Sequence, residues 1–194
     1  MAGPHLENES SRGADPDPPE LLMRRVQEGD ALALQALVAR YSPGLREYVR
    51  GFLPMEDDVE DQVQEVFVRV WERRHRWVPR GSVQAYLYQT ARNLSLLHLR
   101  HRSVRERHAS NVRNGSARVP TPDDLAARGE LKDALDEALA NMPERRREAF
   151  RLVRADGLRL REAAEIMGVT KRTVANHLHL ALTELGEKLR DFHS

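Results

Sequence analysis

Apolar side chains recur every three or four residues along most of this chain, and no sustained stretch alternates with a period of two. The first spacing places apolar residues on one face of a helix, whereas a half-buried strand requires alternation. Aromatic residues make up only 5% of the chain, which disfavours a large β-sandwich or barrel. Because 31% of the residues are charged and 40% are apolar, the composition suits amphipathic helices. We therefore predict an all-α protein.

Four helical segments are predicted in the N-terminal half of the chain. They are expected at about residues 19–28, 31–53, 56–76 and 82–102. Asp30 and Ser82 are suited to cap the second and fourth segments, because their side-chain oxygens can accept hydrogen bonds from free helical N–H groups. Pro43 lies inside the second segment and is expected to kink it or to restart it.

The segment at 56–76 carries the clearest apolar stripe, at Val59, Val63, Val66, Phe67, Val70 and Trp71. Acidic residues crowd its first turns and arginines crowd its last turns, an order that complements the helix dipole. For Val63, Val66, Phe67 and Val70 we favour a role in the core over a role in binding a partner.

The net charge of +1 results from a cancellation between three parts of the chain. Residues 1–68 hold 6 basic and 14 acidic residues, for a net charge of −8. Residues 69–120 hold 12 basic and 2 acidic residues, for +10, and residues 121–194 hold 13 and 14, for −1. A block of +10 in a nearly neutral chain indicates a surface that faces a polyanion, although a solvated basic helix and linker would give the same count.

Several classes of protein are disfavoured by what the sequence lacks. The chain has no cysteine, which excludes disulfides, thiolate catalysis and cysteine-ligated zinc. No apolar run approaches the ~18 residues needed to cross a bilayer, and residues 1–20 lack a signal-peptide pattern. We therefore expect a cytoplasmic protein without membrane insertion. Since no phosphate-binding loop, catalytic triad or metal-binding histidine spacing occurs, we predict no enzyme, no cofactor and no metal.

Between residues 103 and 128 the periodicity is lost, and Ser, Asn, Gly and Pro become frequent. Such a composition is typical of a linker between domains. Residues 1–18 are polar and proline-containing, and are predicted to form a disordered tail. We therefore predict two small helical domains, at 19–102 and 129–194, joined by a flexible basic linker at 103–128.

The C-terminal domain is expected to end in a helix-turn-helix. Its four helices are predicted at about 129–141, 143–156, 160–167 and 171–190. Gly168 can adopt the left-handed conformation of a tight turn, and Thr170 can cap the final helix. An ordinary helical hairpin is the alternative. In a helix-turn-helix, the polar face of the final helix would meet DNA through Lys171, Arg172, Thr173, Asn176, His177 and His179.

Two motifs in the N-terminal domain resemble a known family. Residues 61–71 read DQVQEVFVRVW, and residues 82–94, after a short loop, read SVQAYLYQTARNL. Both strongly resemble the promoter-melting domain of extracytoplasmic-function (ECF) sigma factors, which are dissociable subunits of RNA polymerase. The helix-turn-helix resembles the domain of the same family that reads the −35 element. The resemblance extends over about residues 19–102 and 129–190, in the family's order and spacing.

The resemblance implies that promoter DNA and core RNA polymerase are partners of this chain. It also implies roles for two groups of residues in the N-terminal domain. The helix with the first motif would dock on the clamp coiled coil of core RNA polymerase through Asp61, Gln64, Glu65, Arg69 and Trp71. The loop and the next helix would bind the melted −10 element, with one base flipped out, through Arg76, Trp77, Arg80, Ser82, Tyr86, Tyr88, Gln89, Arg92, Asn93 and Arg100. An anti-sigma factor is implied as a further partner.

Two departures from the family pattern affect these expectations. Ala175, Asn176 and His177 occupy positions where the family often has Lys/Arg-Ser-Arg, which implies a different −35 sequence or a weaker hold on phosphates. Leu97 stands where the family often has Asp, so local packing is expected to differ. Leu180, also unlike the family, could support an added apolar contact with another helix.

Three alternatives belong to other functional classes. A stand-alone helix-turn-helix transcriptional regulator would leave the motif at 61–71 unexplained. A helical scaffold or anti-sigma-like protein without DNA binding would leave the +10 block and the polar final helix unexplained. An enzyme would need a catalytic arrangement that the sequence does not contain.

Overall fold

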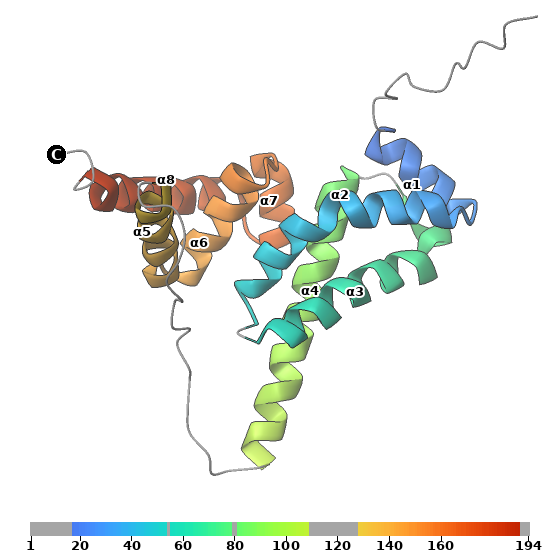
Figure 1. Ribbon diagram of the computed structural model, residues 1–194, viewed down its shortest axis with the longest axis horizontal. Coiled ribbons are helices and arrows are strands. Elements are labelled where there is room, and N and C mark those ends of the chain that lie inside the picture. Colours follow the sequence, from blue (N-terminus) through green and yellow to red (C-terminus); the bar gives the residue numbers. More distant parts are fainter. Residues whose placement is uncertain (1–16, 54, 79–80, 109–127, 191–194) are drawn as a thin grey trace, which may run out of the picture.

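The computed structural model describes residues 17–53, 55–78, 81–108 and 128–190, and all the regular structure in these residues is helical (Figure 1). The N-terminal half contains α1 (Pro19–Gln27), α2 (Ala31–Arg50), α3 (Glu56–Glu72) and α4 (Val83–His108). The C-terminal half contains α5 (Arg128–Asn141), α6 (Glu144–Phe150), α7 (Leu160–Met167) and α8 (Lys171–Arg190). A 3-10 turn, η1 (Arg74–Arg76), follows α3, and a π-helical turn, η2 (Arg151–Ala155), continues α6. The all-α prediction is confirmed.

The predicted N-caps are confirmed at atomic detail. Asp30 Oδ1 accepts hydrogen bonds from the backbone N–H groups of Leu32, at 2.9 Å, and Ala33, at 3.2 Å. Ser82 Oγ accepts one from the backbone of Ala85, at 3.1 Å, at the start of α4. Each bond satisfies a donor that the first helical turn would otherwise leave free. Pro43 lies within α2, which continues through it to Arg50.

Two helix ends differ most from the predicted ones, and α2 also ends three residues before its predicted end, at Arg50. The helix predicted to reach residue 76 ends at Glu72, where Arg74 folds back so that its guanidinium lies 4.4 Å from the centre of the Trp71 ring. In contrast, α4 continues to His108, six residues beyond its predicted end, because residues 103–108 contain neither Gly nor Pro to stop it. The start of the predicted linker is therefore helical. Residues 109–127 of that linker, and 1–16 of the predicted tail, lie outside the described residues.

The apolar stripe of α3 lies in the core between α2 and α4. Val63, Val66, Phe67 and Val70 are each at most 5% exposed, which confirms the core role predicted for them. Around them pack the inward-facing residues of α1, α2 and α4, including Leu37 and Leu87, neither of which is exposed at all. Burial of this stripe removes apolar surface from water and thereby stabilises the N-terminal half.

The hydrophobic core continues from the N-terminal half into the C-terminal half. Leu87 and Tyr88 of α4 belong to the same buried cluster as Leu152, Ile166 and Met167, which lie on η2 and α7. Figure 1 shows α7 beside α4, and these two helices are in direct contact. A separate small cluster joins α5, α6 and α8. The two halves predicted as domains on a flexible linker thus share one core.

Across the described ranges, no helix is both long and apolar enough to span a bilayer. Within the same residues, no group of three or more His, Asp or Glu side chains is placed to hold a metal ion.

Candidate nucleic-acid interface

The helix-turn-helix is built by a glycine turn and a threonine cap, as predicted. Gly168 has φ 66° and ψ 36°, the left-handed conformation that glycine adopts without strain. Thr170 Oγ1 accepts a hydrogen bond from the backbone N–H of Thr173 at 3.2 Å, at the start of α8. Val174 and Leu178 are buried against the rest of the C-terminal half. These contacts fix which face of α8 meets solvent.

The solvent-facing side of α8 presents most of the predicted DNA-contacting residues. Lys171, Arg172, Asn176 and His179 are exposed, and His177 is half-buried. Thr173 differs, since its hydroxyl lies 2.8 Å from that of Thr170 and takes part in the cap. Cations suited to phosphates and an amide suited to a base edge therefore share one accessible face.

The residues predicted to bind the −10 element divide into exposed and buried groups. Arg76, Gln89, Asn93 and Arg100 are exposed, while Ser82 and Tyr86 are partly buried. Arg80 lies outside the described residues. The other three predicted residues, Trp77, Tyr88 and Arg92, are at most 9% exposed.

The loop before α4 is anchored through Trp77. Its ring is buried, and its backbone oxygen accepts a hydrogen bond from Gln27 Nε2 of α1 at 3.1 Å. Trp77, Ser82, Tyr86 and Gln89 line a small cleft of about 100 Å³. The opposite wall of this cleft belongs to the C-terminal half, where α7 contributes Glu162, Glu165 and Ile166.

Arg92 forms an ion pair with a residue of the C-terminal half. Its Nε lies 2.8 Å from Glu148 Oε1 of α6, and the two residues are 9% and 4% exposed. The same carboxylate oxygen accepts a hydrogen bond from the hydroxyl of Tyr48 at 3.0 Å. On its other side, Glu148 Oε2 lies 3.3 Å from Arg145 Nη1. The buried charge of Glu148 is thus compensated mainly by groups of the N-terminal half.

A second cross-link between the halves joins α4 to Asp156. Tyr88 donates its hydroxyl proton to Asp156 Oδ1 at 2.7 Å, and Gln84 Nε2 donates to the backbone oxygen of Asp156 at 2.6 Å. Burial raises the pKa of Asp156 to about 6, with the hydrogen bond from Tyr88 acting against that rise. Burial and the nearby carboxylate also raise the pKa of Tyr88, so its hydroxyl stays protonated and donates.

A third cross-link joins the loop before α4 to α7. Ser82 Oγ donates to Glu162 Oε1 at 2.5 Å, and the backbone N–H of Arg159 donates to Glu162 Oε2 at 3.0 Å. Burial raises the pKa of Glu162, but these hydrogen bonds outweigh it and leave the pKa below its ordinary value. Glu162 is therefore held as a carboxylate against the loop.

Sequence reasoning missed the three carboxylates Glu148, Asp156 and Glu162. They lie on separate elements, 56, 68 and 80 residues from the groups they contact in the N-terminal half. No motif or local spacing joins them, so no signal in a single sequence could have found them.

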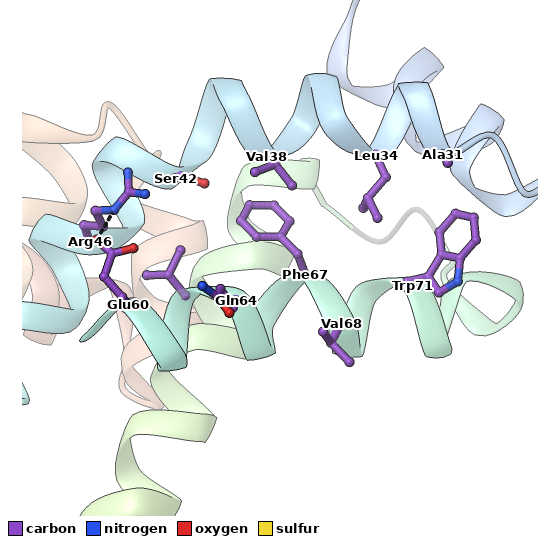
Figure 2. Close-up of a pocket in the computed structure, with 11 residues that line it drawn as sticks. Ala31, Leu34, Val38, Ser42, Arg46, Glu60, Gln64, Phe67, Val68 and Trp71 are labelled. Atoms are coloured by element: carbon purple, nitrogen blue, oxygen red, sulfur yellow. Dashed lines mark hydrogen bonds and ion pairs between the residues drawn. The ribbon is translucent and has the colours of Figure 1, made fainter. Parts of the chain in front are cut away.

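The face predicted to bind a protein partner contains an apolar groove between α2 and α3. The groove holds about 590 Å³. Figure 2 shows Leu34 and Val38 of α2 facing Phe67 and Trp71 of α3, with the ion pair Arg46–Glu60 at the end away from Trp71. Val68, on the outer side of α3, is 48% exposed.

Of the five residues predicted to face the polymerase, only two belong to the lining of this groove. Gln64 and Trp71 line it. Asp61, Glu65 and Arg69, spaced four residues apart, lie further round α3 and are not part of the lining. Glu65 pairs with Arg69 at 2.6 Å. A mostly apolar groove with a polar rim has the character of a protein-docking surface.

Comparison with known proteins accounts for both halves of the chain. Residues 37–105 match the family described as Sigma-70 region 2, and residues 132–185 match Sigma-70, region 4. The chain is also 32% identical, over 170 residues, to the "ECF RNA polymerase sigma factor SigF" of Caulobacter vibrioides, covering 87% of this chain and 92% of that protein. The chain belongs to the extracytoplasmic-function family of sigma factors. It is thus an alternative sigma factor, which directs promoter-specific transcription initiation.

Other relatives of this sigma factor agree in length and fold. The "ECF RNA polymerase sigma-E factor" of Escherichia coli K12 is 28% identical over 180 residues, covering 88% of this chain and 94% of that protein. Among solved structures, CnrH in complex with the cytosolic domain of CnrY has 25% identity and a TM-score of 0.64, with 92% of this chain and all of that chain covered. The sigma factor RpoE of Bartonella quintana, in complex with the anti-sigma factor NepR, has 22% identity and a TM-score of 0.59, covering 80% and 96%.

The match to region 2 decides against the stand-alone regulator. A regulator with only a helix-turn-helix would leave residues 37–105 without a counterpart, whereas a sigma factor accounts for them.

Proposed function

We propose that this sigma factor divides its work among three surfaces. The groove between α2 and α3 holds core RNA polymerase, the exposed face of α8 reads the −35 duplex, and the loop at 77–82 with α4 opens the −10 element. The observation that carries this proposal is the joint match to regions 2 and 4, combined with the exposed polar face on α8.

Binding energy, and no covalent chemistry, drives the opening of DNA in this proposal. Unstacking and flipping a base costs a few kcal/mol, which aromatic stacking and contacts to phosphates can offset. Tyr86 and Gln89 line the small cleft beside the loop, and the exposed Asn93 and Arg100 lie further along the same helix. We therefore expect no catalytic activity from this chain alone.

Each of these surfaces has a proposed binding partner. Core RNA polymerase is the proposed occupant of the α2–α3 groove, and promoter DNA binds as a duplex at −35 and as a melted strand at −10. An anti-sigma factor is a further proposed partner, in keeping with the complex of the Bartonella quintana sigma factor with NepR. A cytoplasmic location, where polymerase and promoters are found, also belongs to this proposal.

Run-off transcription with purified core polymerase tests the whole proposal. Addition of this protein to core polymerase on a library of genomic promoters is expected to give discrete, promoter-specific transcripts. A folded preparation that supports no specific initiation on any promoter in the library would overturn the proposal.

The assignment of the −10 surface is tested by Asn93→Ala combined with Arg100→Ala. Both residues are exposed on α4, so the folded state should survive their loss. Promoter opening, measured by permanganate reactivity of the unpaired thymines, is expected to fall while −35 duplex binding persists. Arg190→Ala, at an exposed position at the end of α8, is the control and should open promoters normally. Unchanged opening in the double variant would refute the assignment.

The docking groove is tested by Val68→Glu, which places a charge at an exposed apolar position on its rim. Affinity for core polymerase, measured without DNA, should fall at least about tenfold, because the new carboxylate must be desolvated on docking. Val78→Glu, at another exposed valine outside the groove, is the matched control. Equal affinity of the two variants would remove the groove from the proposal.

A further inference from the structure

We propose that the C-terminal half holds this sigma factor in a closed, self-masked state, in which Glu148, Asp156 and Glu162 occupy the groups that would otherwise contact −10 DNA. The proposal rests on the −10 surface proposed above and describes the regulation of that surface. Opening of the two halves then becomes a required step before a promoter can be melted.

The masking contacts fall on the predicted −10 residues themselves. Arg92 is paired with Glu148, Tyr88 donates to Asp156, and Ser82 donates to Glu162. In each contact the N-terminal half supplies the donor and the C-terminal half supplies the carboxylate. Carboxylate oxygens accept from guanidinium and hydroxyl groups as phosphate oxygens do, so the C-terminal half meets these donors with the chemistry of a DNA backbone.

The shape of the interface agrees with its chemistry. Glu162, Glu165 and Ile166 of α7 form one wall of the cleft lined by Trp77, Ser82 and Tyr86. A base entering this cleft from the side of α7 would therefore meet protein. The shared apolar core, which includes Leu87 and Met167, holds the two halves together.

The closed state leaves the other DNA-binding surface free. Lys171, Arg172 and Asn176 are exposed on α8 while Arg92 and Tyr88 are buried. The two surfaces are thus controlled separately, because in the closed molecule the −35 surface is exposed while the −10 surface is covered. We expect a partner that binds the N-terminal half only in the open state to release the mask.

The test removes one carboxylate from the C-terminal half. Glu148→Ala leaves the Arg92 cation buried without its partner in the closed state, but costs nothing comparable in the open state, where Arg92 is solvated. Glu184→Ala is the matched control, because Glu184 pairs with Arg146 inside the C-terminal half, at 3.4 Å. Arg151→Ala is a second opening variant, because Arg151 donates from η2 to the backbone oxygen of Glu47 on α2.

Two measurements are made on the full chain without polymerase. The distance between spin labels at Gln35→Cys and Glu187→Cys, both exposed, reports opening, and the chain has no native cysteine to interfere. Binding of a single-stranded oligonucleotide with the non-template −10 sequence reports unmasking. We expect Glu148→Ala and Arg151→Ala to lengthen the label distance and to tighten oligonucleotide binding by roughly tenfold or more, with Glu184→Ala unchanged.

The outcomes separate this proposal from the function on which it rests. If the wild-type protein supports specific run-off transcription, but neither opening variant changes the label distance or the oligonucleotide affinity, the masking proposal is wrong and the function stands. If the wild-type protein supports no specific initiation, the proposed function fails first. Circular dichroism of each variant establishes that its helices are intact.

Discussion

At the scale of single residues, close contacts across the two halves leave little room for added atoms. Gly44 of α2 is an example, because a Cβ at this position would collide with the hydroxyl of Tyr88 and lie 3.3 Å from Asp156 Oδ1. Glycine is needed here for the close approach of two helices and a loop. The same hydroxyl makes the hydrogen bond to Asp156 that joins α4 to the C-terminal half.

We predict that Gly44→Ala destabilises the protein by about 1–3 kcal/mol, because the added methyl must displace Tyr88 or push the helices apart. Urea denaturation measures the loss. Gly186→Ala, at a position of α8 where the added Cβ would point into open space, is the control and should be neutral or gain up to about 1 kcal/mol of stability. Equal effects of the two substitutions would contradict the close contact.

At the scale of elements, we propose that base reading and phosphate binding belong to different residues along one face of α8. Asn176 carries an amide that can form two hydrogen bonds with one adenine, whereas Lys171, at the start of the helix, carries a point charge suited to phosphate. The cap from Thr170 fixes the start of the helix, and the burial of Val174 fixes its rotation.

Substitutions on α8 should therefore act in two distinct ways. Asn176→Ala is expected to cost about 1–3 kcal/mol on the preferred −35 duplex and little on an unrelated duplex. Lys171→Ala is expected to weaken binding to both duplexes alike. It should also reduce, by about 1, the steepness with which the logarithm of the binding constant falls with the logarithm of the salt concentration. Fluorescence anisotropy on duplexes chosen by selection from a random pool measures both. A uniform loss in Asn176→Ala would show that it contacts only the backbone.

The contact between η2 and α4 carries a pH dependence through Asp156. Burial raises its pKa from 3.8 to about 6, so the folded protein binds this proton more readily than the unfolded chain does. The groups facing Asp156 are Tyr88 and Gln84 of α4, Arg151 of η2 and Glu47 of α2. The stabilising contribution of the proton is complete below pH 3.8 and is lost as the pH rises through about 6.

We accordingly predict that the free energy of unfolding of the wild-type protein, relative to Asp156→Asn, rises as the pH falls from about 7 to about 5. The asparagine variant keeps a neutral acceptor for the Tyr88 hydroxyl and removes the titration. Denaturation of both proteins across this range measures the difference. A difference that stays constant with pH would show that Asp156 does not titrate in this window.

At the scale of the whole molecule, the shared core couples the folding of the two halves. Leu87 of α4 and Met167 of α7 belong to one buried cluster, and the ion pair between Arg92 and Glu148 lies in the same interface. Two halves that share a core and a buried ion pair are expected to unfold together.

This coupling can be observed because both tryptophans of the chain, Trp71 and Trp77, lie in the N-terminal half. We predict that the urea transitions followed by tryptophan fluorescence and by circular dichroism coincide in the wild-type protein. In Glu148→Ala the two transitions should separate, since the halves no longer stabilise each other. Separate transitions already in the wild-type protein would contradict the shared core.

Local signals account for much of what could be predicted. The caps at Asp30, Ser82 and Thr170 and the turn at Gly168 were all predicted, because each depends on residues within a few positions along the chain. The helix-turn-helix and the two region-2 motifs likewise depend on contiguous sequence, which is why they led to the family. The end of α4 was placed too early, because a basic polar segment without Gly or Pro is compatible with both a helix and a linker.

The sequence by itself determined the helices, their caps, the exposed polar face of α8 and the membership of the sigma factor family. Only the tertiary structure decided which of the predicted −10 residues face solvent and which are covered. Arg92 and Asn93 are neighbours in one motif, yet Arg92 is buried against Glu148 and Asn93 is exposed. The reason is physical: helix formation depends on neighbours three or four positions away, whereas burial depends on which surface, 56 residues further along the chain, packs onto that face of the helix.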